Sequence, residues 1–259
     1  NEHHIHDAGK AYRQQFTSDL AVAAYPSDDA LFKAKWLRTW LSMRIQPGTT
    51  VVLIGAEHAL PTWELEIGSL ALTTDAPYSD LTGDGIPETA VTRIIGPPEL
   101  MLRQLRGKTS YGNRAVILCS EDTRVHLETR AFTEALSKRG YDAAIVGKQN
   151  HPALSQADFI IHFGHGSPEG LFNRFGEPFV TASDMPSLTS HPVVFVDGCS
   201  TLPVGSPLLR AFFKQGAAGY LGSTATVLGM IPARFTNELV EHFLHLLAGH
   251  PEGTLPQLL

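Results

Sequence analysis

The stretch Phe159-Ile-Ile-His-Phe-Gly-His-Gly-Ser167 decides the fold class of this chain. It is an apolar, β-branched run that stops at glycines, and a second run of the same kind, Pro192-Val-Val-Phe-Val-Asp-Gly-Cys-Ser-Thr201, follows it. Short apolar runs bounded by turn residues are typical of strands that are buried in a sheet. Because ligands bind at the carboxyl ends of strands in an α/β sheet, we expect the side chains after the two runs to form a site.

Strand-like and helix-like segments alternate along most of the chain. Apolar runs predict strands at residues 51–54, 90–95, 115–118, 142–146, 159–163, 193–196 and 218–221. Helical spacing and capping residues, such as Ser206-Pro207 and Gly216, predict helices at residues 31–43, 98–105, 127–138, 207–215 and 234–247. This alternation is typical of an α/β fold with a largely parallel sheet and helices on both faces. Residues 107–113 form a predicted linker, so we expect a smaller N-terminal α/β subdomain at 1–108 and a second subdomain at 109–259.

The composition excludes some classes of function. The 259 residues are 43% apolar and 18% charged, which is ordinary for a folded protein. Their formal net charge of −6 gives no sign of the basic surface that binds a nucleic acid. No apolar run approaches the roughly 18 residues of a membrane-spanning helix. Neither Gly-x-Gly-x-x-Gly nor a Walker loop is present to bind a nucleotide. The chain begins at Asn rather than Met, which is typical of a processed or excised piece.

Cys199 is the candidate nucleophile. Gly198 before it and Ser200-Thr201 after it favour a tight turn, which would point the thiol outward and leave the Cys199 N–H to face an oxyanion. The alternative is a strand-end cysteine that only packs in the core. The other cysteine, Cys119, also follows a predicted strand. A bridge between the two is conceivable, but a nucleophilic Cys199 has to stay free.

His165 is the candidate partner of this thiol. It lies between two glycines, where a side chain has no packing role, whereas His162 lies inside the predicted strand and is interpreted as structural. Sulfur and imidazole at neighbouring strand ends would form the thiolate–imidazole pair of a cysteine hydrolase. The N–H of Gly166 is then a candidate second donor to the oxyanion.

Two acidic stretches are further candidates. Glu121 follows the third predicted strand, and its carboxylate either accepts from the histidine ring and fixes its tautomer or starts a helix. Asp80, Asp84 and Glu88 stand in a Gly-rich loop with the spacing of the first part of an EF-hand calcium loop. Val91 replaces the bidentate Glu that ends such a loop. The alternatives are a structural calcium site and a Gly/Pro turn with solvated acids.

The order of several motifs resembles the gingipain-type cysteine peptidases, peptidase family C25 of the caspase-like clan, over most of residues 50–250. An early buried strand is followed by an acidic Gly-Asp-Gly segment, an Arg-Ile strand, the Gly-His-Gly-Ser motif, the cysteine strand and one further strand. These motifs occupy residues 51–55, 74–88, 90–94, 164–167, 192–199 and 216–224.

The resemblance implies a caspase-like three-layer sandwich with a mostly parallel central sheet, preceded by a smaller α/β subdomain. It also implies a protein or peptide substrate, chemistry that requires no cofactor, and an extracellular or cell-surface location. The residues it implies are Cys199 as nucleophile, His165 as its partner, Glu121 as the acid that orients the histidine, the N–H groups of Gly166 and Cys199 as the oxyanion hole, and Asp122 and Ser200 as substrate contacts.

Some departures from the family pattern affect the pocket. Gly198 stands where the family usually has Ala, and Ser200-Thr-Leu-Pro203 follows the cysteine. The segment after Glu121 is shorter than in gingipains, so the acid that selects a basic P1 side chain is not placed, and Asp122 and Glu128 are the nearby candidates for it. We expect a cysteine endopeptidase that works through a Cys-His dyad and an acyl-enzyme. The alternatives are a non-catalytic caspase-like binding or scaffold module of a larger surface protein, and a small-molecule hydrolase or acyl transferase with the same dyad.

Overall fold

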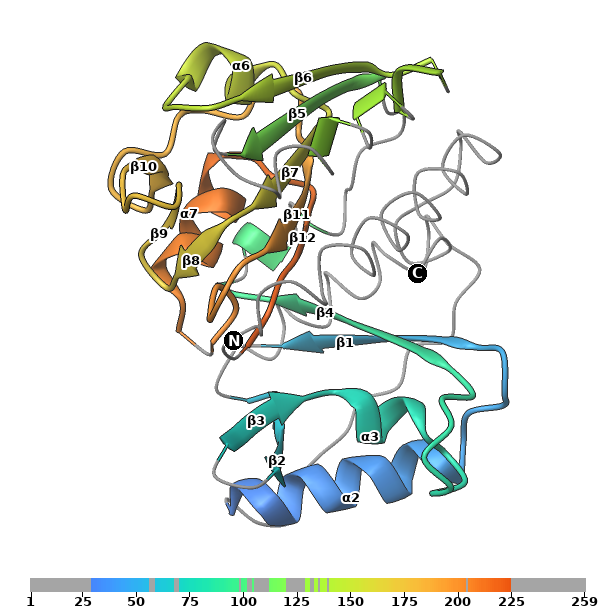
Figure 1. The fold of residues 1–259 in the computed structure, drawn as a ribbon. Helices are drawn as coiled ribbons and strands as arrows, with labels where there is room; N and C mark the ends of the chain where they lie inside the picture. Colours follow the sequence, from blue (N-terminus) through green and yellow to red (C-terminus); the bar gives the residue numbers. More distant parts are fainter. Residues whose placement is uncertain are drawn as a thin grey trace. The chain divides into compact units, whose positions relative to one another are not determined.

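A computed structural model shows two compact units, the first ending at Arg106 and the second beginning at Gly107. It describes residues 29–55, 59–67, 70–97, 99–101, 104, 112–119, 129–130, 133–134, 136–138, 140–203 and 205–224. Figure 1 shows both units. The predicted subdomain boundary at residue 108 and the helix predicted at 234–247 lie outside the described residues.

The first unit contains two pairs of strands. β1 (Thr50–Gly55) and β4 (Ala90–Ile95) run parallel and pair residue for residue. β2 (Trp63–Ile67) and β3 (Leu70–Thr74) form an antiparallel pair that the sequence analysis did not predict. A signal was present, since apolar residues alternate with two glutamates along β2, which is the period of a half-buried strand.

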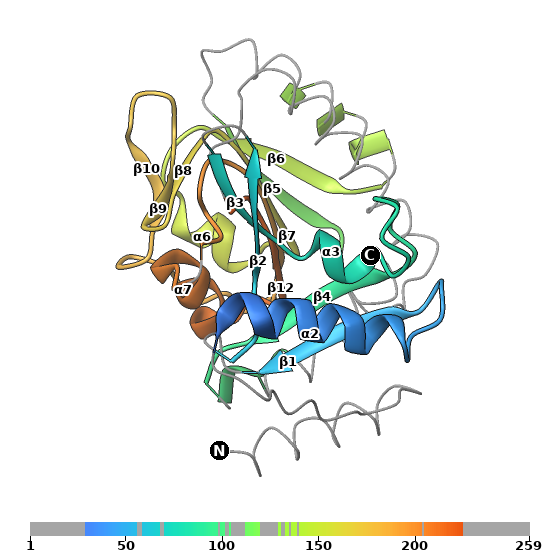
Figure 2. The ribbon, with the colours of Figure 1, turned by 90° about the horizontal axis from the view of Figure 1, so that it is seen from below.

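Helix α2 (Ala30–Ser42) shares the core of this unit with β1, and Figure 2 shows it as the long helix of the unit. Asp29 caps its N-terminus, because the carboxylate accepts from the Phe32 N–H at 2.6 Å. The short helix α3 (Ala76–Ser79) follows β3. The helix predicted at 31–43 is confirmed, and its apolar stripe is the reason it docks on the strands. The helix, the strands and α3 share one core, which consists of Ala34, Leu37, Leu41, Val51, Leu53 and Tyr78.

The second unit is built on a five-stranded parallel sheet with the order β12-β11-β7-β5-β6. All of β7 and all but the first residue of β5 are buried, as expected for central strands covered on both faces. Apolar runs predicted all five strands, and the α/β class with a mostly parallel central sheet is confirmed. The strands are β5 (Arg114–Cys119), β6 (Asp142–Val146), β7 (Phe159–Phe163), β11 (Val193–Asp197) and β12 (Gly219–Leu221).

Helices flank this sheet. α6 (His151–Ser155) precedes β7, and the described residues between 129 and 138 are helical. α7 (Pro207–Gln215) has the ends that the sequence predicted. The Ser206 hydroxyl accepts from the N–H of the third helical residue at 3.3 Å, and Gly216 ends the helix with a φ of 120°.

A small antiparallel sheet carries the histidine motif. Its strands are β8 (His165–Ser167), β9 (Gly170–Phe172) and β10 (Pro178–Thr181), in the order β10-β9-β8. No sequence pattern predicts this sheet, since the glycines around His165 are typical of a turn. Strands of three or four residues are too short to show a period, and they form here because they pair with one another.

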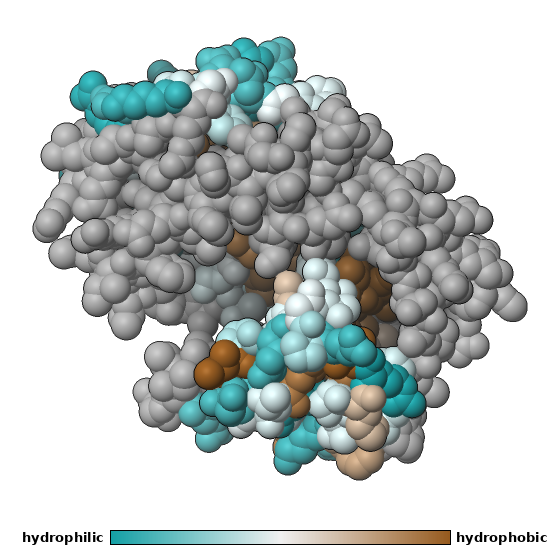
Figure 3. Space-filling view, turned by 90° about the vertical axis from the view of Figure 1, so that its right-hand side faces the viewer, coloured by the Kyte–Doolittle hydropathy of each residue, from teal (hydrophilic) through white to brown (hydrophobic). Residues whose placement is uncertain are grey.

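Figure 3 shows hydrophilic and apolar residues mixed over the described part of one side. Scattered apolar side chains are normal on protein surfaces. No helix among the described residues has the length and apolarity to cross a membrane. The exposed large apolar side chains are Leu31, Phe32, Met43, Ile86, Phe175 and Leu221.

Candidate active site

The candidate histidine and cysteine follow two strands that are neighbours in the sheet. β7 and β11 run parallel, with Phe163 paired to Asp197 at their carboxyl ends (Figure 1). His165 comes two residues after the end of β7, and Cys199 comes two residues after the end of β11. The Gly164 N–H donates to the Asp197 carbonyl at 3.2 Å and ties the two strand ends together. The structure therefore brings both residues to the sheet edge where α/β proteins bind ligands.

The loops after these strands are in contact through their glycines. A Cβ on Gly198 would lie 3.2 Å from the Gly166 nitrogen and 3.3 Å from the Gly164 carbonyl oxygen. A Cβ on Gly166 would collide with the Thr201 methyl group and lie 3.0 Å from the Cys199 carbonyl oxygen. Glycine at 166 therefore permits a close approach that a side chain would prevent, and a side chain at 198 would require the neighbouring loop to shift by a few tenths of an ångström. The Gly166 amide lies directly against the cysteine loop as a result.

The cysteine stands in a turn between core and solvent. Cys199 forms no disulfide and is half-buried, and His165 is exposed. Ser200 has a φ of 49°, in the left-handed region that residues other than glycine rarely adopt. Thr201 is completely buried and anchors the turn in the core. Backbone conformations of this kind are concentrated at functional sites, and Ser200 is one of the predicted substrate contacts.

His162 lies inside β7 and is completely buried. Because a carbonyl oxygen only accepts, Nε2 carries the proton and donates to the Phe172 carbonyl at 3.3 Å, while Nδ1 has no hydrogen-bond partner. The ring also packs edge-on against Phe179. Burial lowers the pKa of His162 to about 4, the hydrogen bond to Phe172 opposes this, and the nearby His165 lowers it further. The ring is neutral at pH 7 and fastens β9 to β7, a structural role as the sequence predicted.

Cys119 ends β5, on the opposite side of β7 from β11. Two strand spacings, about 10 Å, therefore separate the strand ends that carry the two cysteines, which is too far for a disulfide. Neither cysteine is in a disulfide. Burial raises the pKa of the Cys119 thiol, and a hydrogen bond from the Thr129 hydroxyl only partly offsets this. Glu121 and Asp122 lie outside the described residues, so their roles stay predictions.

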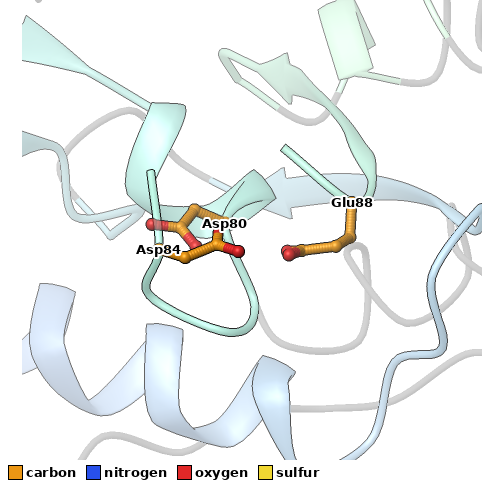
Figure 4. Close-up of side chains that lie close together, drawn as sticks. All are labelled: Asp80, Asp84 and Glu88. Atoms are coloured by element: carbon orange, nitrogen blue, oxygen red, sulfur yellow. The ribbon is translucent and has the colours of Figure 1, made fainter. Parts of the chain in front are cut away.

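The acidic loop of the first unit brings Asp80, Asp84 and Glu88 together (Figure 4). One carboxylate oxygen from each lies within 4.8 Å of the others, a donor set that suits calcium. The carboxylates also bond the loop itself. Asp80 accepts from the Gly83 N–H at 2.6 Å, and Glu88 accepts from a backbone N–H and a hydroxyl at 2.6 and 2.8 Å. Arg38 of α2 adds a positive charge 3.7 Å from Asp80. Both the calcium site and the self-bonded turn are compatible with this geometry.

Two residues beside the active-site loops were not among the predicted site residues. Thr201 packs its methyl group on Gly166, and its buried hydroxyl lies near the buried phenol of Tyr220, although neither forms a full hydrogen bond. Burial raises the pKa of Tyr220 above its usual range, and the Thr201 hydroxyl beside it opposes this rise. Ser206 was predicted only as a helix cap, yet it contacts both loops. Local sequence pattern carries no signal for such contacts.

Residues 32–255, which are most of the chain, match the family model of peptidase family C25. The chain therefore belongs to peptidase family C25. The family recognised from the order of the motifs is confirmed, and the five-stranded parallel sheet flanked by helices is consistent with the caspase-like fold of that family. Membership supports a peptidase, and family C25 implies the cysteine type.

The chain is also similar to a solved structure described as "Structure of Protease", with a TM-score of 0.58 and 17% sequence identity. The similarity covers 77% of this chain and 50% of that one, so this chain spans about half the length of that structure. At this identity the similarity supports the fold alone. No curated protein sequence matches the chain significantly.

Proposed function

We propose that the chain is a cysteine endopeptidase that cleaves protein or peptide substrates through Cys199 and His165. One observation carries the proposal: the neighbouring parallel strands β7 and β11 end two residues before His165 and Cys199, and the loops that follow them are in backbone contact. The Cys199 thiol is in no disulfide and is partly exposed, so a substrate can reach it as a nucleophile. Membership in family C25 supports the same reaction class. The chemistry requires no cofactor.

In the proposed reaction the Cys199 thiolate attacks the scissile carbonyl carbon, and an electron pair of the C=O bond moves onto oxygen as the S–C bond forms. The N–H groups of Gly166 and Cys199 would stabilise this oxyanion. The C–N bond then breaks, His165 gives a proton to the leaving amine, and a thioester remains. A water molecule loses a proton to His165 and attacks the thioester carbon; the C–S bond then breaks, which releases the acid product and restores the thiolate and the protonated His165.

Further assignments rest on the family resemblance. Glu121 would accept from the ring of His165 and fix its tautomer. Asp122 and Ser200 would contact the substrate, and the left-handed turn at Ser200 supports its place in the pocket. The same resemblance is the ground for an extracellular or cell-surface location. The calcium ion in the acidic loop is proposed from the loop spacing and the donor set.

Alkylation by iodoacetamide at low concentration tests the nucleophile. We expect the wild type to be labelled at Cys199 and the Cys199→Ala variant to stay unlabelled, because Cys119 is buried and its thiol pKa is raised. The matched control, Cys119→Ala, should keep the label. Equal slow labelling of the wild type and Cys199→Ala would contradict the proposal.

Digestion of a peptide library, read by mass spectrometry, tests the reaction. We expect cleavage inside peptides, lost in Cys199→Ala and in His165→Ala, and His165 is exposed, so its replacement should leave the fold intact. The cleaved bonds would also identify the P1 residue. A non-catalytic module would cut nothing, and a small-molecule hydrolase or acyl transferase would turn over simple esters while leaving the library intact.

A further inference from the structure

The hydroxyl of Ser206 lies where the two active-site loops meet the start of α7. Ser206 is buried, with 1% of its surface exposed, and its Oγ accepts from the Leu209 N–H at 3.3 Å as the helix cap. The same Oγ lies 3.1 Å from the Thr201 carbonyl oxygen and 3.4 Å from the Pro168 carbonyl oxygen. One side chain therefore contacts a helix and two loops.

The two carbonyls belong to the two loops of the candidate active site. Thr201 comes two residues after Cys199, and Pro168 comes three residues after His165. The hydroxyl has one proton and donates to the nearer Thr201 carbonyl, while the Leu208 N–H donates to the Pro168 carbonyl at 2.8 Å. The first turn of α7 thus holds the cysteine loop and the histidine loop at the same time.

This arrangement exceeds what a helix cap requires. α6 supplies the comparison, because Asn150 caps it by accepting from the Ala153 N–H at 3.2 Å. Among the described residues, the Asn150 side chain makes no hydrogen bond to either active-site loop. The Ser206 cap has the same local geometry but adds the donated bond to Thr201.

Loss of that bond would act at the packed junction of the loops. Thr201 is completely buried, so its carbonyl would be left without the donor that Ser206 provides. The Thr201 methyl group covers Gly166, so a shift of Thr201 would be transmitted to the amide assigned to the oxyanion hole. Displacements of about 1 Å in a catalytic constellation cost about 100-fold in rate.

We propose that Ser206 is a positioning residue that holds the Cys199 loop and the His165 loop in register by binding them to the first turn of α7. This inference rests on the proposed function, since it assigns Ser206 a part in the same site. The residue touches no reacting atom and acts through the backbone of the two loops.

The test compares Ser206→Gly with Asn150→Gly. Glycine is nearly as good a helix cap as serine or asparagine, so both variants should fold, and each loses one capping side chain. The rate is measured on the best fluorogenic peptide from the library digest. We expect kcat to fall about 10- to 100-fold in Ser206→Gly with KM little changed, while Asn150→Gly keeps the wild-type kcat. Ser206→Thr, which retains a hydroxyl, should restore most of the rate.

Hydrogen–deuterium exchange provides a readout that does not depend on catalysis. We expect faster exchange of the amides of residues 164–167 and 199–202 in Ser206→Gly and unchanged exchange there in Asn150→Gly. Equal exchange in the two glycine variants, or faster exchange in Ser206→Gly with an unchanged kcat, would overturn the role of Ser206. If the wild type neither cleaves the library nor alkylates at Cys199, the proposed function fails, and exchange alone then decides whether Ser206 holds the two loops.

Discussion

Lowering the pH should destabilise the second unit through His162. Burial holds the pKa of this ring at about 4 in the folded protein, whereas a histidine in the unfolded chain titrates near 6.5. Above pH 6.5 the ring is neutral in both states, so its contribution to the stability of the folded protein is fully present. As the pH falls from 6.5 toward 4, the ring binds a proton in the unfolded chain but stays neutral in the folded protein, so the folded protein loses stability. Each pKa unit is worth about 1.4 kcal/mol, so the difference between the folded and unfolded pKa of His162 corresponds to about 3 kcal/mol of unfolding free energy.

Urea unfolding at pH 7 and pH 4, followed by far-ultraviolet circular dichroism, measures this loss. The comparison variant is His162→Gln, which keeps a donor for the Phe172 carbonyl but carries no titratable ring. Other groups titrate in both proteins and cancel in the difference. Hydrogen exchange of the β7 amides reports the second unit specifically.

We expect the unfolding free energy of the wild type to fall by about 3 kcal/mol more than that of His162→Gln between the two pH values. The same pH dependence in both proteins would refute the reasoning, because it would mean that the ring is charged or solvated in the folded state.

Three further predictions concern other positions. Gly166→Ala should abolish library cleavage, because a Cβ there collides with the side chain packed over it; wild-type kcat in this variant would contradict the loop packing. Arg93→Leu should lower the urea-unfolding free energy by about 2 kcal/mol, because Arg93 makes two hydrogen bonds to Asp75 and two to backbone carbonyls. As a control, Arg114→Leu removes an exposed ion pair and should lower the unfolding free energy by less than about 1 kcal/mol. If the two variants lost the same unfolding free energy, the reasoning for Arg93 would be contradicted. Calcium should raise the melting temperature of the wild type but not of Asp84→Asn, and no shift on adding calcium would leave only the self-bonded turn.

Local signals explain which elements could be predicted from the sequence. The strands of the parallel sheet are buried on both faces, so their apolar runs stand out. The ends of α7 follow from Ser206, Pro207 and Gly216, whose side chains or conformations suit the ends of a helix. The strands β8, β9 and β10 were missed because each is too short for a period and is stable only when paired. The alternation of apolar and acidic residues along β2 was a usable signal for a strand, although β2 was not predicted.

The candidate site also contains features that the sequence predicts and contacts that it does not. His165 and Cys199 could be singled out because each follows an apolar run and is flanked by small residues. The contact of Gly166 with the cysteine loop could not be predicted, because it depends on the order of β7 and β11 in the sheet. Ser206 looked like an ordinary cap for the same reason, since its contact with the Pro168 carbonyl joins two segments that converge only after folding.

By itself, the sequence determined which reactive groups this protein carries and which strands and helices precede them, because side-chain chemistry and short-range periodicity are local properties. Only the tertiary structure decided that β7 and β11 are neighbours and that one hydroxyl at the start of α7 reaches the loop of Pro168, 38 positions away. Strand order and contacts over such separations arise from packing of the whole sheet, which no short stretch of residues specifies.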